Sequence, residues 1–474
     1  MIIPDLNRLD HGSEGLHVPP GWCSPEVTGR TARTQGYDVG VDDRLYRRNF
    51  FRQLNDAALE PDDPRYVRIY DDKRIAQDDP ISLMQTTIEW TVGSSVQLFS
   101  GFRGSGKSTE LRRLRSSLQD SNYIVLLFDA EDYLNLSIPV DVPDFLLAVA
   151  GAFGEAVAFA GLLEGEITEY SYWDRFQAFL KKIHIEELET EVGLGPMKFG
   201  VKANLRSDPD FTATLQRRMA GHLGSFVDDV REYVTSVVLK LREAHPDAAG
   251  IVLIADSIEH IRGISANSEE VQRSVESLFA VHASKLHLPG VHVVYTVPPW
   301  LKILYPGLSS LYEPGGVQVL PTLKVHERET GEPFLAGLDI LVDVVAARGD
   351  WTLLLSRDQL NKICLSSGGH LRDLLRILGD VLRRATALPV DEDVVDRALE
   401  AARNELLPIA EEDARWLMRI SLEHDVALPD VERLPALARF LDTHLALCYR
   451  NGREWYDLHP LIRENVLSQT SQKG

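Results

Sequence analysis

The 474-residue sequence has little cysteine and methionine, with three of the first and five of the second. Cys23, Cys364 and Cys448 lie far apart and show no metal-ligand spacing, so we expect reduced structural thiols rather than a disulfide framework. The 14 histidines show no metal-ligand spacing either, and the G-x-S-x-G elbow of serine hydrolases is absent. No nuclease, protease or nucleosidase constellation is therefore recognisable.

Excess positive charge and long apolar runs are also missing. The formal net charge of −21 argues against a general nucleic-acid or anionic-membrane coat but leaves room for a small basic face. The most apolar stretch, 144–163, carries Glu155 in its middle, and only about ten uncharged residues precede this glutamate, half of what a membrane span needs. The first residues, MIIPDL, place an acid where a secretory signal has basic residues. We therefore expect a cytoplasmic protein without a membrane partner.

Composition and periodicity divide the chain into four parts. Residues 1–45 are rich in Pro, Gly, Asp and Arg without a sustained period, which predicts a flexible N-terminal arm. Residues 46–350 alternate helical segments with uninterrupted apolar strands, the pattern of a parallel sheet covered on both faces. Residues 351–410 contain only helical patterns and predict a helical lid. Residues 411–474 combine helices with a hairpin and predict a winged-helix-like domain.

Individual helices, strands and hairpins can also be predicted from the sequence. A helix is expected over 79–93, and an inserted hairpin near 190–206, where the pattern alternates around a Gly-Pro pair. The final domain contains a hairpin with Asn451-Gly452 as its type I′ turn. Strands are expected over 65–72, 95–100, 123–132, 250–260, 291–299 and 317–321.

The stretch SVQLFSGFRGSGKSTEL matches G-x-x-x-x-G-K-[ST] at every fixed position from Gly101 to Ser108. It follows an expected strand and opens an expected helix, so its backbone amides and the positive end of the helix can hold phosphates. We expect the loop residues Gly101, Gly104, Ser105 and Gly106 to line the phosphates of ATP. Lys107 would reach the β- and γ-phosphates, Ser108 would ligate Mg²⁺, and Thr109 would contact the α-phosphate.

A magnesium site needs an acid at the end of a second buried strand. Asp256 takes this position in IVLIADSIEH, and Glu259 follows where it can polarise the attacking water. An acid there also suits the start of a helix, so the structural role stays open. Asp129 and Glu131 end another strand and are alternative acids. ATPases of this kind commonly have the catalytic acid beside the magnesium-binding Asp, where this chain has Ser257, so slow hydrolysis is expected.

Two further residues complete the predicted site. Thr296 ends the strand after the magnesium strand, where a group that senses the γ-phosphate would lie. Arg372 begins a helix after SSGGH, where a lid could reach back to the phosphates, although an ion pair with Asp373 is the alternative.

The LSSGGH sequence is similar to the signature loop of ABC ATPases. That loop precedes the magnesium strand, whereas here the sequence follows it by more than a hundred residues, so we reject the ABC assignment.

This order of loop, magnesium strand, polar-tipped strand, lid arginine and winged helix resembles the AAA+ and STAND ATPases. Over roughly 80–465 it is most similar to the origin-recognition/Cdc6-like group. Within that group, GFRGSGKSTEL, LLFDAED and LSSGGHLRDLLR resemble bacterial ATPases of conflict or anti-phage systems. The resemblance implies Lys107 and Ser108 on phosphate and magnesium, Asp256 on magnesium, Thr296 as first sensor and Arg372 as second sensor.

The resemblance also implies a homo-oligomer with an arginine finger, for which Arg262, Arg217 and Arg218 are candidates. Because the chain shows no nuclease, protease or nucleosidase constellation, we expect any effector to be a separate protein. The aspartate of an Asn/Thr-Lys-x-Asp motif is missing from NKIC at Asn361, which argues against GTP specificity. A small-molecule kinase would lack the lid and winged helix.

The remaining alternative is a DNA-binding initiator or loader that acts through its winged helix. The arginines of that segment are interspersed with acids, a near-neutral balance that favours a protein partner over DNA. On the wing, Trp455 and Tyr456 are expected in the core rather than stacked on bases. The four arginines are Arg433, Arg439, Arg450 and Arg453.

Overall fold

The computed structural model describes residues 43–75, 78–163, 182, 205–219, 221–263, 267–426, 428 and 433–471. The expected flexible arm lies outside this part, except for its last residues, which begin helix α1 (Asp43–Gln53). The hairpin expected near 190–206 also lies outside it, except for Leu205 and Arg206, which are helical.

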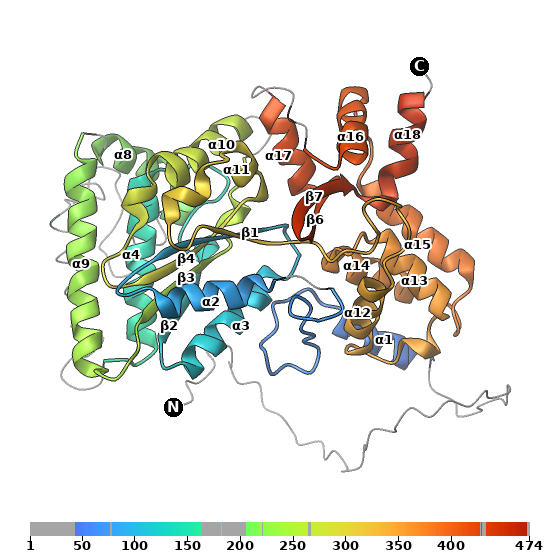
Figure 1. Cartoon of the computed structure of the whole chain (residues 1–474), viewed down its shortest axis with the longest axis horizontal. Coiled ribbons are helices and arrows are strands. Elements are labelled where there is room, and N and C mark those ends of the chain that lie inside the picture. Colours follow the sequence, from blue (N-terminus) through green and yellow to red (C-terminus); the bar gives the residue numbers. More distant parts are fainter. Residues whose placement is uncertain are drawn as a thin grey trace, which may run out of the picture.

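A five-stranded parallel sheet organises the α/β part of the chain, in the order β2-β3-β4-β1-β5 (Figure 1). This confirms the α/β fold with a parallel sheet. Because the strands are parallel, their carboxyl ends meet at one edge, where the phosphate-loop sequence after β1 and the acids after β2 and β3 come together. The strands are β1 (Val96–Gly101), β2 (Ile124–Asp129), β3 (Ile251–Asp256), β4 (His292–Val297) and β5 (Val317–Leu320).

Alternate strand residues bury into two cores, one on each face of the sheet. In β3, Leu253 belongs to the first core and Ile254 to the second, because successive side chains of a strand point to opposite faces. Helices α2 (Pro80–Trp90) and α3 (Lys107–Asp120) pack together and contribute to the second core. The first core takes up α4 (Val142–Phe159), α8 (Pro209–Met219), α9 (Leu223–Ala244) and α10 (Ser268–Glu276).

Helix α4 is the one described helix that is long and apolar enough to cross a membrane. It is 72% buried inside the protein, where it packs against α8, α9 and β2. A buried core helix passes the same test of length and composition as a membrane span, and burial on this scale accounts for its apolar sequence.

A group of helices lies at the carboxyl end of the sheet, where the backbone N–H of Arg372 in this group contacts Gly104 of the loop after β1 (Figure 1). Helix α1 packs against α14, and α12 packs against α13, so the division expected at 350/351 falls between two helices that contact each other. Helix α13 begins with a capping box, in which Ser356 and Gln359 each bond the other's backbone N–H. The helices are α12 (Leu335–Ala346), α13 (Arg357–Ser366), α14 (Leu371–Arg384) and α15 (Glu392–Glu405).

The C-terminal region consists of α16 (Glu411–Glu423), α17 (Leu434–Asp442), strands β6 (Ala446–Asn451) and β7 (Arg453–Leu458), and α18 (Arg463–Ser471). The expected hairpin forms, and Trp455 is buried. The turn type was predicted wrongly. Gly452 has a φ of 86° but Asn451 does not have a positive φ, and a type I′ turn needs both. The register pairs Asn451 with Arg453 around Gly452 alone.

Residues 54–75, which we call the cover segment, follow a path that the sequence did not predict. The strand expected over 65–72 is wrong, because this stretch forms turns and joins no sheet. Asp63 and Asp72 each accept a hydrogen bond from the backbone N–H two residues later, the Asx turn that competes with extended structure. Ile69 and Tyr70 are buried because the segment lies over the phosphate-loop sequence, which explains the strand-like apolar residues.

Candidate nucleotide site

The Gly101–Ser108 loop joins β1 directly to α3, which begins at Lys107. Gly104 and Gly106 have φ angles of 84° and 98°, a region that disfavours residues with a Cβ. A Cβ on Gly104 would lie 2.7 Å from the Cβ of Arg372. The glycines of the motif therefore allow the left-handed backbone of the loop. The missing side chain of Gly104 also leaves room for Arg372 of α14.

Lys107 is almost completely buried, and oxygen atoms surround its ammonium. Nζ donates to the carbonyls of Gly101 at 2.9 Å and Phe102 at 2.8 Å. Nζ also lies 2.9 Å from Oε1 of Glu259. The lysine is thus folded back on its own loop, and a phosphate that binds here exchanges for these oxygen partners.

Glu259 is positioned by the backbone after β3. Ser257 adopts a φ of 65°, which is uncommon for a residue other than glycine and occurs mainly where a site constrains the chain. The short 3-10 helix η2 (Ile258–His260) follows and brings Glu259 to Lys107. Burial opposes the charge of Glu259, but Lys107 and then His260 hold its pKa below the ordinary value. Its Oε2 is buried without a hydrogen-bond partner among the described residues.

Asp256 lies beside Ser108 at the end of β3. Its carboxylate accepts hydrogen bonds from the Ser108 hydroxyl and from the Ser257 N–H. Burial, and then the charge of Glu259, raise the pKa of Asp256 to about 6. The two residues expected on Mg²⁺ are therefore in contact, and the carboxyl group of Asp256 keeps its proton to a higher pH than an ordinary aspartate does.

Thr296 is fully buried at the end of β4. Its hydroxyl accepts a hydrogen bond from the Ile258 N–H at 2.9 Å. The cavity lining does not contain Thr296. Thr296 also contacts the Glu259 side chain directly, so it supports both the η2 segment and the carboxylate on that segment.

A cavity of about 150 Å³ lies between the phosphate-loop residues, the cover segment and the helices α12 and α14. The cover segment forms one wall of the cavity and is bonded to the loop and to α3. The Tyr70 hydroxyl donates to the Ser105 carbonyl, and the Leu59 N–H donates to the Thr109 hydroxyl, both at 3.1 Å. Arg348 also lines the cavity, and its Nε is buried without a partner among the described residues. The cavity is smaller than the ~300–1,000 Å³ of typical ligand pockets, so ATP would need the elements around it to move apart.

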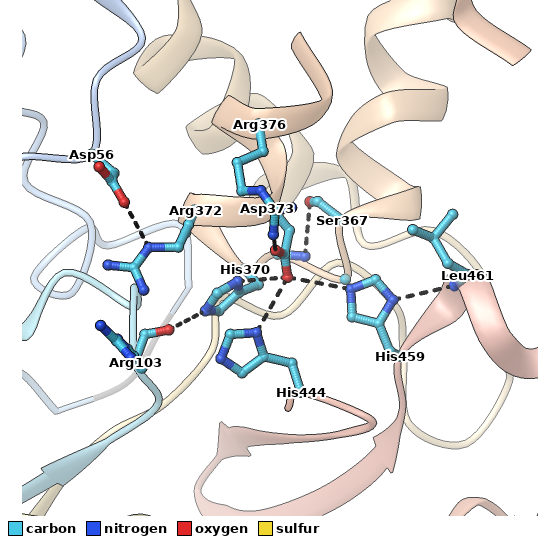
Figure 2. Close-up of polar contacts among 12 residues, drawn as sticks. Asp56, Arg103, Ser367, His370, Arg372, Asp373, Arg376, His444, His459 and Leu461 are labelled. Atoms are coloured by element: carbon cyan, nitrogen blue, oxygen red, sulfur yellow. Dashed lines mark hydrogen bonds and ion pairs between the residues drawn. The ribbon is translucent and has the colours of Figure 1, made fainter. Parts of the chain in front are cut away.

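Arg372 reaches the phosphate-loop residues, as the sequence predicted for a lid residue, and lines the cavity. Its backbone N–H donates to the Gly104 carbonyl at 3.3 Å. Its guanidinium pairs with Asp56 of the cover segment at 2.8 Å (Figure 2), not with Asp373, which was the alternative.

The other candidates lie away from the cavity. Asp129 accepts a hydrogen bond from the Glu131 N–H, and Glu131 pairs with His260. Neither acid lines the cavity, nor do Arg262, Arg217 and Arg218, the candidates for an arginine finger. The structure thus brings Lys107, Ser108, Asp256, Glu259 and Arg372 to one place.

Sequence analysis missed a cluster of three histidines around Asp373, directly behind the phosphate-loop residues (Figure 2). His370 Nδ1 lies 2.7 Å from Oδ2 of Asp373, and the ring nitrogens of His444 and His459 each lie 3.5 Å from the same oxygen. Burial, and then the charge of His370, lower the pKa of His444 to about 4. Only the i,i+3 spacing of His370 and Asp373 is visible in the sequence.

Gly368 and Gly369 fix the position of this cluster. Their φ angles are 61° and 79°. A Cβ on Gly369 would lie 1.8 Å from the Leu323 carbonyl, and one on Gly368 would lie 2.6 Å from Leu447. The glycine pair therefore lets the chain pass between the end of the sheet and the C-terminal hairpin.

The residues present fit a magnesium nucleotide. Ser108 and Asp256 offer the hard oxygen ligands that Mg²⁺ prefers. The buried Oε2 of Glu259 and Oγ of Ser105 have no hydrogen-bond partner among the described residues, which leaves both free for a ligand or its attacking water. The two left-handed glycines supply the cradle for phosphate oxygens.

Comparison with known proteins gives distant structural neighbours only. No family model and no curated protein sequence matches the chain. It is similar to a Walker-type ATPase of Pyrococcus abyssi, with 13% identity and a TM-score of 0.39 over 85% of this chain and 99% of that one. It is also similar to the ORC2 protein of Aeropyrum pernix in its ADP form, with 12% identity and a TM-score of 0.41 over 89% and 98%. A third neighbour is Cdc6p from Pyrobaculum aerophilum, with 13% identity and a TM-score of 0.37 over 88% and 100%.

Proposed function

We propose that the protein binds ATP with Mg²⁺ and hydrolyses it slowly, as a cytoplasmic signalling or assembly ATPase of the AAA+/STAND type. The observation that carries this proposal is the meeting of two pairs at the end of the sheet. Lys107 contacts Glu259, and Ser108 contacts Asp256. A glycine turn with an ordinary surface lysine would bury neither pair.

Each residue has a distinct role in the proposed reaction. Lys107 binds phosphate oxygens, and Ser108 and Asp256 hold the metal ion. Glu259 accepts the proton of the attacking water, and Thr296 keeps η2 in place. Mg²⁺, when bound, would neutralise charge that develops on the phosphates.

The closed cavity supports a held switch rather than a freely cycling enzyme. Lys107 is satisfied by the loop carbonyls and by Glu259, while Arg372 and Asp56 tie α14 to the cover segment. Entry of a nucleotide would break these contacts and move the helices α12–α15 against the sheet. We propose that this movement repositions a winged-helix-like C-terminal region and signals to a separate effector, within a homo-oligomer. The motif resemblance also favours a role in anti-phage defence.

The C-terminal charges favour a protein partner over DNA. Arg439 pairs with Asp413 at 2.6 Å, and Arg450 pairs with Glu454 at 2.9 Å. Arginines paired with acids on the same surface contribute little positive field toward DNA phosphates. Titration of duplex DNA at low salt tests this choice, because binding that weakens steeply with added salt would favour the initiator or loader function instead.

Steady-state ATP turnover by the purified protein, with the Lys107→Ala variant as blank, tests the proposed activity. Slow turnover above the blank supports a complete site. If turnover is absent, retention of ATP or ADP through purification supports the held switch. Absence of both turnover and nucleotide binding, measured with a fluorescent ATP analogue, would overturn the proposal.

A further inference from the structure

The histidine cluster around Asp373 connects three parts of the molecule. His370 and Asp373 lie at the start of α14, His444 precedes β6, and His459 follows β7. His370 also contacts the Arg103 carbonyl of the phosphate-loop sequence through Nε2, at 2.9 Å. His370 and His459 are buried, and His444 and Asp373 have side chains only 13% and 14% exposed. The cluster is therefore a shielded junction.

Hydrogen bonding fixes the proton on one nitrogen of His370. A carbonyl oxygen only accepts, so Nε2 must carry the hydrogen that faces Arg103. The other ring nitrogen, Nδ1, lies 2.7 Å from an oxygen of Asp373 and can either carry a second proton or offer its lone pair to a metal ion. Two electron-rich atoms at this distance repel unless a proton or a cation lies between them. A metal ion and a proton compete for this nitrogen, so metal binding at Nδ1 would release the proton that otherwise joins His370 to Asp373.

We propose that His370 Nδ1, His444 Nδ1 and an oxygen of Asp373 bind a divalent transition-metal ion of the Zn²⁺ class. One ligand atom from each of the three residues lies within 4.8 Å of the others, which is a reach that one ion can bridge with small side-chain movements. Two imidazoles and one carboxylate suit zinc and leave the fourth position to water. The His370 N–H that faces a backbone carbonyl is the outer contact that metal-bound histidines commonly make.

His459 supports the site without binding the metal. The Leu461 N–H donates to Nδ1 of His459 at 3.3 Å, so the hydrogen of the ring is on Nε2, which faces Asp373 at 3.5 Å. This places His459 where it orients the carboxylate. Arg376 lies 3.8 Å from the other oxygen of Asp373, but its side chain is 55% exposed and pairs with Glu405. It therefore leaves the inner oxygen available to a metal.

The bound ion would join α14 to the C-terminal region, directly behind the phosphate-loop sequence. None of the cluster residues lines the nucleotide cavity, so metal binding and ATP binding can be tested separately. The failure of the proposed ATPase function would therefore leave the metal site standing, and the reverse also holds.

Zinc content and cobalt spectroscopy of the full chain test the proposal. After equilibration with Zn²⁺ and removal of free ion, we expect one zinc per chain in the wild type and in the control His222→Ala, whose histidine is exposed on another part of the molecule. His444→Gln and Asp373→Asn should lose the zinc. His459→Gln should weaken binding about tenfold, as expected for an outer contact.

Cobalt binding to the wild-type protein tests the site even if a cluster variant fails to fold. Co²⁺ added to the wild type should give the visible absorption of a tetrahedral site, and Zn²⁺ should remove it. No zinc above background in the wild type, no such absorption, or zinc retained in folded His444→Gln would overturn the metal site. Each result would leave a protonated His370–Asp373 pair as the explanation of the cluster.

Discussion

Lys107 Nζ lies 2.9 Å from Oε1 of Glu259, and both side chains are almost completely buried. The pair joins the first residue of α3 to the turn after β3, next to the contact between Ser108 and Asp256. Removal of one partner from a buried ion pair leaves an uncompensated charge, whose cost is about 3–5 kcal/mol. The lysine of the phosphate-binding motif is therefore a structural residue here as well as a proposed ligand of phosphate.

The first prediction separates these two roles of Lys107. Lys107→Met should abolish nucleotide binding and also lower the melting temperature, because Glu259 is left buried without its cation. Adding Glu259→Gln to the variant should restore most of the thermal stability without restoring nucleotide binding. Thermal melts and titration with a fluorescent ATP analogue measure both effects. Stability equal to wild type in Lys107→Met alone would show that the pair contributes little.

A second prediction concerns catalysis by Glu259. Glu259→Gln should bind ATP but hydrolyse it about 100-fold or more slowly, the range expected on loss of a general base. Glu131→Gln is the matched control, because Glu131 contacts the neighbouring His260 from outside the cavity. Phosphate release under saturating ATP measures the rates. Unchanged turnover in Glu259→Gln would remove this residue from the mechanism.

The raised pKa of Asp256 predicts a pH dependence of metal binding. Below its pKa of about 6 the carboxyl is protonated and a poor Mg²⁺ ligand, and above it the carboxylate is charged. The affinity for subsaturating Mg²⁺ with ATP should therefore rise between about pH 5 and about pH 7.5. In Asp256→Asn this rise should disappear. The same rise in the variant would assign it to another group, including the phosphates of ATP itself.

Arg372 gives a prediction with a neighbouring control. Arg372→Ala should weaken ATP binding about tenfold and slow turnover, because the guanidinium lines the cavity beside Gly104. Arg376→Ala, one turn later on α14, removes an exposed arginine that pairs with Glu405. It should leave both quantities unchanged. Equal behaviour of the two variants would make Arg372 an ordinary surface residue.

Sequence patterns predicted the elements whose signal is local. Uninterrupted apolar runs gave all five strands, and the glycine-lysine motif gave the loop before α3. Strand ends also placed Asp256 correctly beside Ser108. Parallel strands bring their carboxyl ends to one edge, so the order of residues along the chain was enough to predict their meeting.

The missed features depend on contacts between distant segments. The cover segment has strand-like apolar residues because Tyr70 packs over the phosphate loop, and burial from a loop is indistinguishable in sequence from burial in a sheet. The histidine cluster combines residues from α14 and from both ends of the C-terminal hairpin. The position of Glu259 depends on the left-handed backbone of Ser257, and no residue pattern in the sequence predicts that conformation.

The contact between α11 (Pro299–Leu304) and α17 has a practical consequence for anyone who shortens this protein. Trp300 belongs to the same buried core as Phe440 and Leu441. A truncation that ends before α16 would uncover this apolar surface on the sheet side and remove His444 and His459 as well. Expression of the first 410 residues should therefore yield an aggregation-prone fragment, not an autonomous ATPase module.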